Sequence, residues 1–136
     1  MARQPIDTAE DWFQTGKMAF NGGKPEQALY ALEMSVEIAL KAVLISMRVE
    51  VPKVHDIRRV ARTFLAENKA LPKPFRDNFD TYIATFETLL SIRSMVGYGF
   101  EGEKEKKELE AQAKSLIPEC ARIIRACEEA IRKAGT

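Results

Sequence analysis

Apolar residues recur every three or four positions along most of the chain, which is the spacing of amphipathic helices. Glycine and proline residues interrupt this pattern, and they commonly mark helix ends and starts. The pattern predicts helices over about residues 8–20, 24–48, 56–68, 72–96 and 103–133. We expect Asp7 or Thr8 to cap the first helix, Asp56 to cap the third, and Pro118 to kink or divide the last. No segment requires a strand, so the sequence predicts an all-α fold, an up-and-down bundle of four or five helices that forms a single domain over residues 1–136.

The segment 24–48 has more apolar surface than one helix face provides. One dense apolar face, a second apolar strip and a strip of small residues leave a single charged strip. The dense apolar face consists of Leu29, Leu32, Val36, Leu40, Val43 and Met47, and the second apolar strip consists of Tyr30, Met34, Ile38 and Ile45. The strip of small residues consists of Ala28, Ala31, Ser35, Ala42 and Ser46, and the charged strip consists of Glu33, Glu37, Lys41 and Arg48. We therefore expect a central helix whose charged strip faces water or a partner.

Composition narrows the classes of function. The 136 residues with 46% hydrophobic content suffice for one core. The 21 Lys and Arg residues balance 20 Asp and Glu residues, so nucleic-acid binding would have to come from a local patch. No apolar run reaches the roughly 20 residues of a membrane span, and the first residues lack the apolar core of a signal peptide, so a cytoplasmic protein without membrane association is expected. Cys120 and Cys127 would stand about 10 Å apart on one helix face, which favours core packing over a disulfide.

The motifs of common enzyme classes are absent. The sequence contains no P-loop, CxxC, HExxH or GxSxG motif. It contains a single histidine and no ExxH pair of the kind that holds di-metal sites in helical bundles. We expect neither a metal site nor a cofactor.

Three local features carry candidate chemistry. His55 precedes Asp56, which could orient its imidazole, although a helix cap beside an ordinary histidine explains the same residues. Glu33, Glu37 and Lys41 lie in the charged strip, where ion pairs one helical turn apart are the simpler explanation. The third feature is the end of the fourth predicted helix, with its arginine and a tyrosine between two glycines; its residues are Arg93, Ser94 and Tyr98.

These features, taken in order, resemble the HEPN domains, small helical bundles of prokaryotic and archaeal nucleotide- and RNA-related systems. Residues 28–44, with Glu37 and Lys41, are similar to the second helix of that family. Residues 54–57 are similar to its short His-Asp-aliphatic signature. Arg93 occupies the place of the arginine in the family's ribonuclease motif, but Tyr98 stands where that motif has a histidine, and Phe100 keeps the aromatic residue that follows.

The resemblance implies a function that this substitution modifies. Family ribonucleases are thought to cut RNA without metal, through paired Arg and His residues in a dimer cleft. A tyrosine with a pKa of about 10 is a poor base at neutral pH but can donate a hydrogen bond and stack on a base. The leading hypothesis is thus a non-catalytic, homodimeric nucleotide- or RNA-binding protein, an accessory or antidote subunit in a toxin–antitoxin or nucleotidyltransferase-associated system. The expected ligand-binding residues are Arg93, Ser94, Tyr98, Lys41, Glu37 and His55, and no residue is assigned a catalytic role.

Two alternatives remain open at this point. One is a metal-independent endoribonuclease in which His55 or Tyr98 replaces the missing histidine. The other is a structural helical adaptor that uses the apolar strips of segment 24–48 for assembly. The sequence favours a binding protein over an enzyme.

Overall fold

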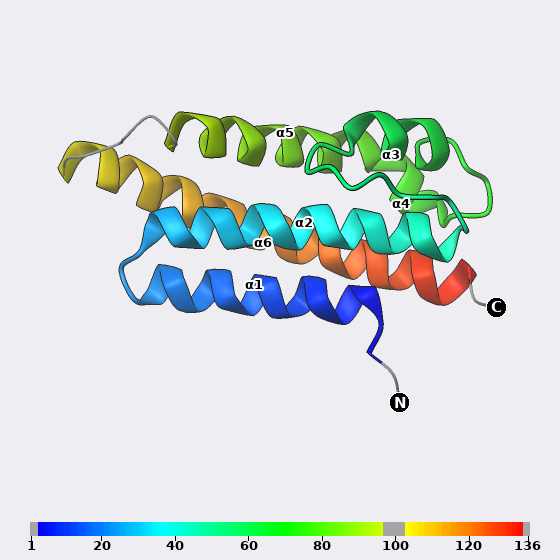
Figure 1. Ribbon diagram of the computed structural model, residues 1–136, viewed down its shortest axis with the longest axis horizontal. Helices are drawn as coiled ribbons and strands as arrows, with labels where there is room; N and C mark the ends of the chain where they lie inside the picture. Colours follow the sequence, from blue (N-terminus) through cyan, green and yellow to red (C-terminus); the bar gives the residue numbers. More distant parts are fainter. Residues whose placement is uncertain (1–2, 97–102, 135–136) are drawn as a thin grey trace.

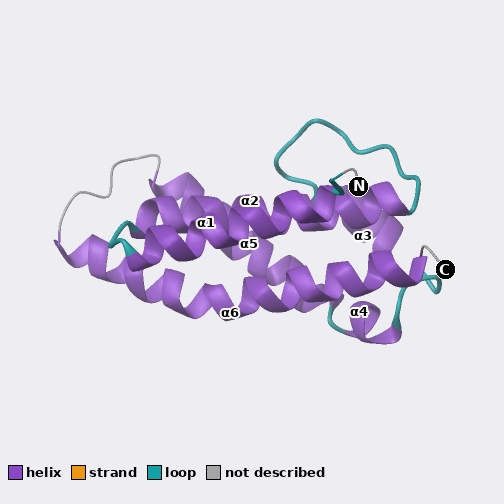
Figure 2. Cartoon of the chain, turned by 90° about the horizontal axis from the view of Figure 1, so that it is seen from below, coloured by secondary structure: helices purple, strands orange, loops and turns teal. Residues whose placement is uncertain are grey.

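Four long helices run alternately in opposite directions along the molecule (Figure 1). The computed structural model describes residues 3–96 and 103–134. The helices are α1 (Pro5–Asn21), α2 (Pro25–Ser46), α3 (Arg58–Leu65), α4 (Lys73–Asp77), α5 (Phe79–Val96) and α6 (Glu103–Ala134). The long helices are α1, α2, α5 and α6, while the short α3 and α4 lie at the end where α5 begins (Figures 1 and 2). No strand occurs in the described residues, so the predicted all-α, up-and-down bundle is confirmed.

Side-chain caps place the starts of two helices. α1 begins earlier than predicted because Gln4 and Asp7 form a reciprocal capping box, in which the Gln4 backbone N–H donates to Asp7 Oδ2 over 2.9 Å. Before α3, Asp56 Oδ1 accepts the backbone N–H of Arg58 at 3.1 Å. The N-cap position is Ile57, so the prediction of Asp56 as N-cap is wrong by one residue, although the Asp56 carboxylate binds the first N–H of the helix.

The segment predicted as the fourth helix, residues 72–96, forms two helices, α4 and α5. Asn78 separates α4 from α5, with a backbone ψ of 5° that departs from helical geometry, and its side chain donates to the carbonyl of Pro74 over 2.8 Å. A polar side chain that bonds to nearby backbone competes with regular helix, which explains the break. In contrast, α6 continues through Pro118 as one helix instead of dividing there.

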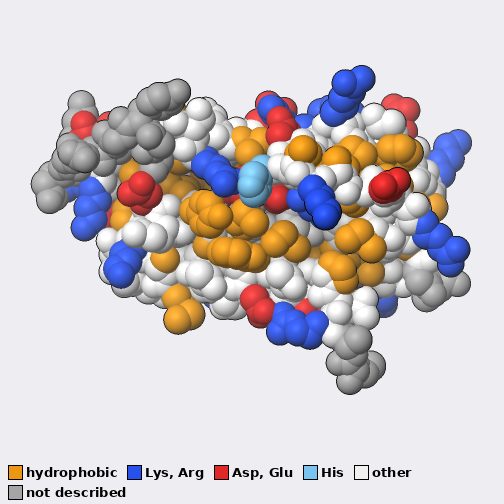
Figure 3. All heavy atoms as spheres, in the orientation of Figure 1, with side chains coloured by type: hydrophobic (Ala, Val, Ile, Leu, Met, Phe, Trp, Pro, Cys, Tyr) orange, Lys and Arg blue, Asp and Glu red, His pale blue; other side chains and the backbone are white. Residues whose placement is uncertain are grey.

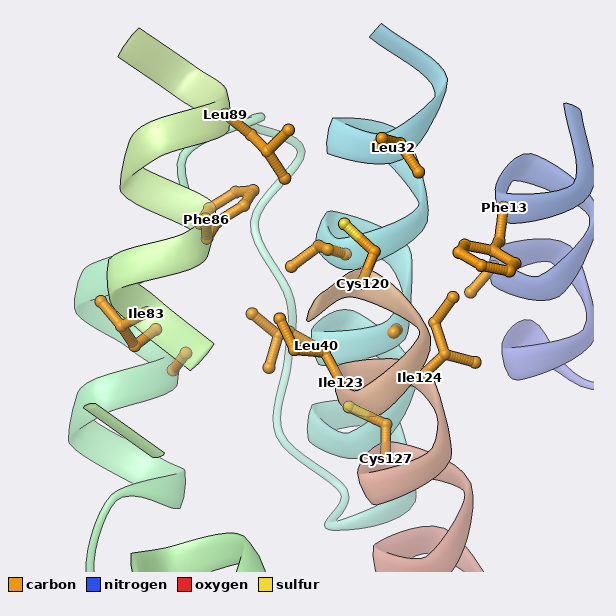
Figure 4. Close-up of a cluster of buried hydrophobic side chains, with 14 of the residues drawn as sticks. Phe13, Leu32, Leu40, Ile83, Phe86, Leu89, Cys120, Ile123, Ile124 and Cys127 are labelled. Carbon is orange, nitrogen blue, oxygen red and sulfur yellow. The ribbon is translucent and has the colours of Figure 1, made fainter. Parts of the chain in front are cut away.

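The core forms around α2, which contacts α1, α3, α5 and α6. Figure 4 shows Leu40 of α2 beside Ile123 of α6, with Phe86 approaching from α5, and all three side chains are buried. Cys120 and Cys127 are free and buried in this cluster, as predicted. Burial raises the pKa of the Cys120 thiol to about 12, so it packs as a small apolar group.

One strip of α2 stays at the surface. Tyr30 and Ile45 are 42% and 51% exposed, and Met34 and Ile38 are half-buried between them. Hydrophobic side chains gather on this face of the molecule in Figure 3. The second apolar strip of α2 is thus available for contact with another molecule. Among the residues that the structure describes, none of the helices has the length and hydrophobicity needed to cross a membrane.

Candidate functional site

Two acidic residues of α2 are buried in the bundle. Glu33 is fully buried and Glu37 is 2% exposed. Burying a carboxylate is costly unless a cation or hydrogen-bond donor compensates it. The expectation that this charged strip faces water or a partner is wrong for both residues, because α5 and the linker 47–57 supply groups that cover them.

Glu33 joins α2 to the end of α5. Arg93 donates from its guanidinium to Glu33 Oε1 over 3.0 Å, although the two residues are 60 positions apart in the sequence. Arg93 lies in the last turn of α5, where the helix dipole favours a cation, and one-third of its side chain is exposed. Burial raises the pKa of Glu33, and the nearby Glu37 carboxylate adds to the rise, whereas Arg93 opposes it. Glu33 Oε2 is buried and has no hydrogen-bond partner among the described residues.

Glu37 binds two further groups. Lys41 Nζ donates to Glu37 Oε2 over 2.9 Å, and His55 Nδ1 lies 3.1 Å from Glu37 Oε1. A carboxylate oxygen accepts hydrogen bonds, so Nδ1 of His55 is assigned as the donor in this contact. The His55 side chain is 60% exposed, so a ligand can reach it. The histidine is visible on the face drawn in Figure 3, beside basic and hydrophobic side chains.

The ligand-type atoms of Glu33, Glu37 and His55 all lie within 4.8 Å of one another. We call these three residues with Lys41 and Arg93 the charged cluster. The cluster holds two carboxylates against two fixed cations, so its positive groups are largely neutralised inside the protein. An anion that binds there must compete with Glu33 and Glu37.

A cavity of about 510 Å³ opens beside the charged cluster, between α1, α2 and α5. The guanidinium carbon of Arg93 lies 5.0 Å from the centre of the Tyr30 ring, and Trp12 meets Tyr30 edge-on with ring centres 5.9 Å apart. Glu26 and Gln27 also line the cavity and provide hydrogen-bonding groups. Aromatic faces, an arginine and polar acceptors in one cavity are the groups that bind unstacked bases and their phosphates.

The structure brings together four of the predicted site residues. Arg93, Glu37, Lys41 and His55 belong to the charged cluster, while Ser94 is exposed next to Arg93 at the end of α5. Tyr98 lies outside the described residues.

Three residues of the site were missing from the prediction. Glu33 was assigned to the charged strip and not to the binding site, and its spacing from Glu37 could have suggested a shared role. Tyr30 was assigned to an apolar strip and Trp12 was not singled out, because periodicity reports which helix face a residue occupies and not whether that face is covered. Their contact across α1 and α2 became apparent only in the structure.

The fold places this protein among the small helical-bundle domains, and its arginine at the end of the third long helix pairs with a buried acid of the second. The chain belongs to the HEPN domain family, which matches residues 2–130 and thereby confirms the resemblance seen in the sequence. No curated protein and no solved structure matches the chain.

Proposed function

We propose that this HEPN protein binds single-stranded RNA or a nucleotide in the cavity between α1, α2 and α5, and does not cut it. The observation that carries the proposal is the position of Arg93 beside Tyr30 and Trp12 in one cavity. The arginine supplies donors for a phosphate, and the aromatic rings supply surfaces for a base. Family membership supports a nucleotide- or RNA-related role in general.

The ion pair with Glu33 sets the strength of this binding. Arg93 already donates a hydrogen bond to Glu33 Oε1. A phosphate therefore binds Arg93 less tightly than it would bind an unpaired arginine. Because Tyr98 stands where the family's ribonuclease motif has a histidine, we propose that the protein acts as an accessory or antidote partner, for example of a small nucleotidyltransferase. Co-purification with such a partner, when the two are produced together, is the outcome that this role requires.

The binding site is tested with variants that separate Arg93 from its acid partner. Glu33→Gln should bind a short single-stranded RNA more tightly than wild type, because it releases Arg93 while keeping the shape of the side chain. Glu33→Gln combined with Arg93→Gln should bind at least about tenfold more weakly than Glu33→Gln alone, the scale of a lost charged hydrogen bond. The chain has a single tryptophan, so quenching of Trp12 fluorescence on titration reports entry of the RNA into this cavity.

Arg122→Gln is the matched control, because Arg122 of α6 is exposed and pairs with Glu119 away from the cavity. It should bind RNA like wild type apart from a small general charge effect. Equal binding by the double variant and by Glu33→Gln would exclude Arg93 from the site. Absence of RNA and nucleotide binding from every form would favour the structural adaptor.

A metal-independent ribonuclease is the second candidate, and one contact favours it. Glu37 orients His55 through Nδ1, so Nε2 would be the base that this ribonuclease uses within the charged cluster. We expect little or no cleavage in EDTA, since the family's histidine is replaced by Tyr98 and general acid–base help is worth about 10²–10⁴-fold in rate. Rapid cleavage by wild type that disappears in His55→Ala would make the ribonuclease the better assignment.

We further propose that the protein is a homodimer. The second apolar strip of α2, Tyr30, Met34, Ile38 and Ile45, meets the charged cluster where Arg93 lies over Tyr30, so a second copy packed there would bring two clusters close together. Sedimentation equilibrium at tens of micromolar should give twice the monomer mass of 15.4 kDa. Ile38→Glu should shift this equilibrium to the monomer, and a wild-type protein that stays monomeric would contradict the proposal.

A further inference from the structure

We propose that Glu33, Glu37 and His55 form a binding site for a divalent transition-metal ion, with zinc as the occupant that their chemistry suits. Their ligand-type atoms lie within 4.8 Å of one another. Carboxylate oxygens and an imidazole nitrogen are ordinary zinc ligands. Three ligands from the protein would leave a fourth position for water or an anion.

An independent observation points to a ligand at this place. Glu33 Oε2 is buried and unpartnered in the described part of the chain, although a carboxylate oxygen removed from water normally has a donor. Leaving such an atom unsatisfied is destabilising, and more so for a charged group than for a neutral one. A cation placed between the two glutamates would satisfy this oxygen.

Glu37 and His55 are close enough to bind the same metal ion. Zinc holds oxygen and nitrogen ligands at about 2.0–2.1 Å, so two ligands in tetrahedral geometry stand roughly 3.3 Å apart. Glu37 Oε1 and His55 Nδ1 are separated by 3.1 Å. The Nδ1 proton of the metal-free protein must leave before this nitrogen binds, and Nε2 can carry a proton instead because His55 is 60% exposed. Glu33 would supply the third ligand, since its ligand-type atom lies within 4.8 Å of those of Glu37 and His55.

Two cations compete with a metal for these carboxylates. Lys41 and Arg93 each donate to one glutamate. Both side chains reach solvent, with 21% and 33% of their surface exposed, so they can turn outward and recover hydration. The lack of an ExxH motif in the sequence does not exclude this site, because its acids come from successive turns of α2 and its histidine comes from the linker before α3.

Calorimetric titration of the EDTA-treated, dialysed protein with zinc chloride tests the site. Wild type should bind one zinc ion per chain, and Glu37→Gln and His55→Ala should each weaken binding at least about tenfold, as loss of a ligand or its support does. Glu87→Gln is the control for carboxylate loss, since Glu87 is half-exposed on α5 and outside the cluster. The variant with both Cys120→Ala and Cys127→Ala controls for zinc binding by thiols. Both controls should match wild type.

Cobalt supplies a second measurement. A cobalt-loaded protein should show visible ligand-field bands without the near-ultraviolet band of a cobalt–thiolate bond, and His55→Ala should remove these bands while its helical circular dichroism stays at the wild-type level. Failure of wild type to bind zinc, wild-type affinity in Glu37→Gln or His55→Ala, or a thiolate band that the cysteine variant abolishes would each overturn the proposal. The titrations contain no nucleic acid, so their outcome is independent of the proposed RNA binding.

Discussion

Arg93→Ala is expected to lower the free energy of unfolding by about 2–4 kcal/mol. The substitution leaves the fully buried Glu33 carboxylate without its cation, and breaking one side of a buried ion pair costs about 3–5 kcal/mol. The smaller figure reflects the partial exposure of Arg93, through which water can reach Glu33. Urea unfolding followed by circular dichroism measures the change.

A second substitution should reverse most of this loss. Glu33→Gln together with Arg93→Ala removes the buried charge, so the double variant should be more stable than Arg93→Ala alone. Arg122→Ala provides the comparison, because its exposed ion pair with Glu119 is worth at most about 1 kcal/mol. Equal stability of Arg93→Ala and Arg122→Ala would show that Glu33 is not charged or not buried in solution.

Leu40→Ala is expected to lower the free energy of unfolding by about 2–5 kcal/mol. Leu40 is fully buried in the middle of α2, and Figure 4 places it among side chains of α5 and α6. Truncation removes apolar contact and leaves a cavity that closely packed helices fill only in part. The same urea experiment applies, with the unfolding slope checked for constancy.

Ile45→Ala is the matched control on the same helix. Ile45 is 51% exposed, so its truncation should change the stability of the monomer by less than about 1 kcal/mol. A loss for Ile45→Ala that grows with protein concentration would show that the exposed strip is covered in a dimer. A small effect of Leu40→Ala would contradict the position of α2 at the centre of the core.

The sequence by itself determined the helical class, the central position of the second helix and the family. Hydrophobic periodicity depends on neighbours three and four residues apart, so it could be read directly for Leu32, Leu40 and the buried cysteines. The short segments around His55 and Arg93 retain the order that the family shows, which made the resemblance visible before any fold was known.

Only the tertiary structure decided where the charges lie. The ion pair of Glu33 with Arg93 joins residues 60 positions apart, and the contact of Glu37 with His55 joins residues 18 positions apart. Local spacing explains Glu37 with Lys41 on a single helix, but it carries no information on which helix or linker covers that face. Burial of both glutamates, the unpartnered oxygen of Glu33 and the cavity beside Tyr30 all arise from the packing of α1, α5 and the linker onto α2.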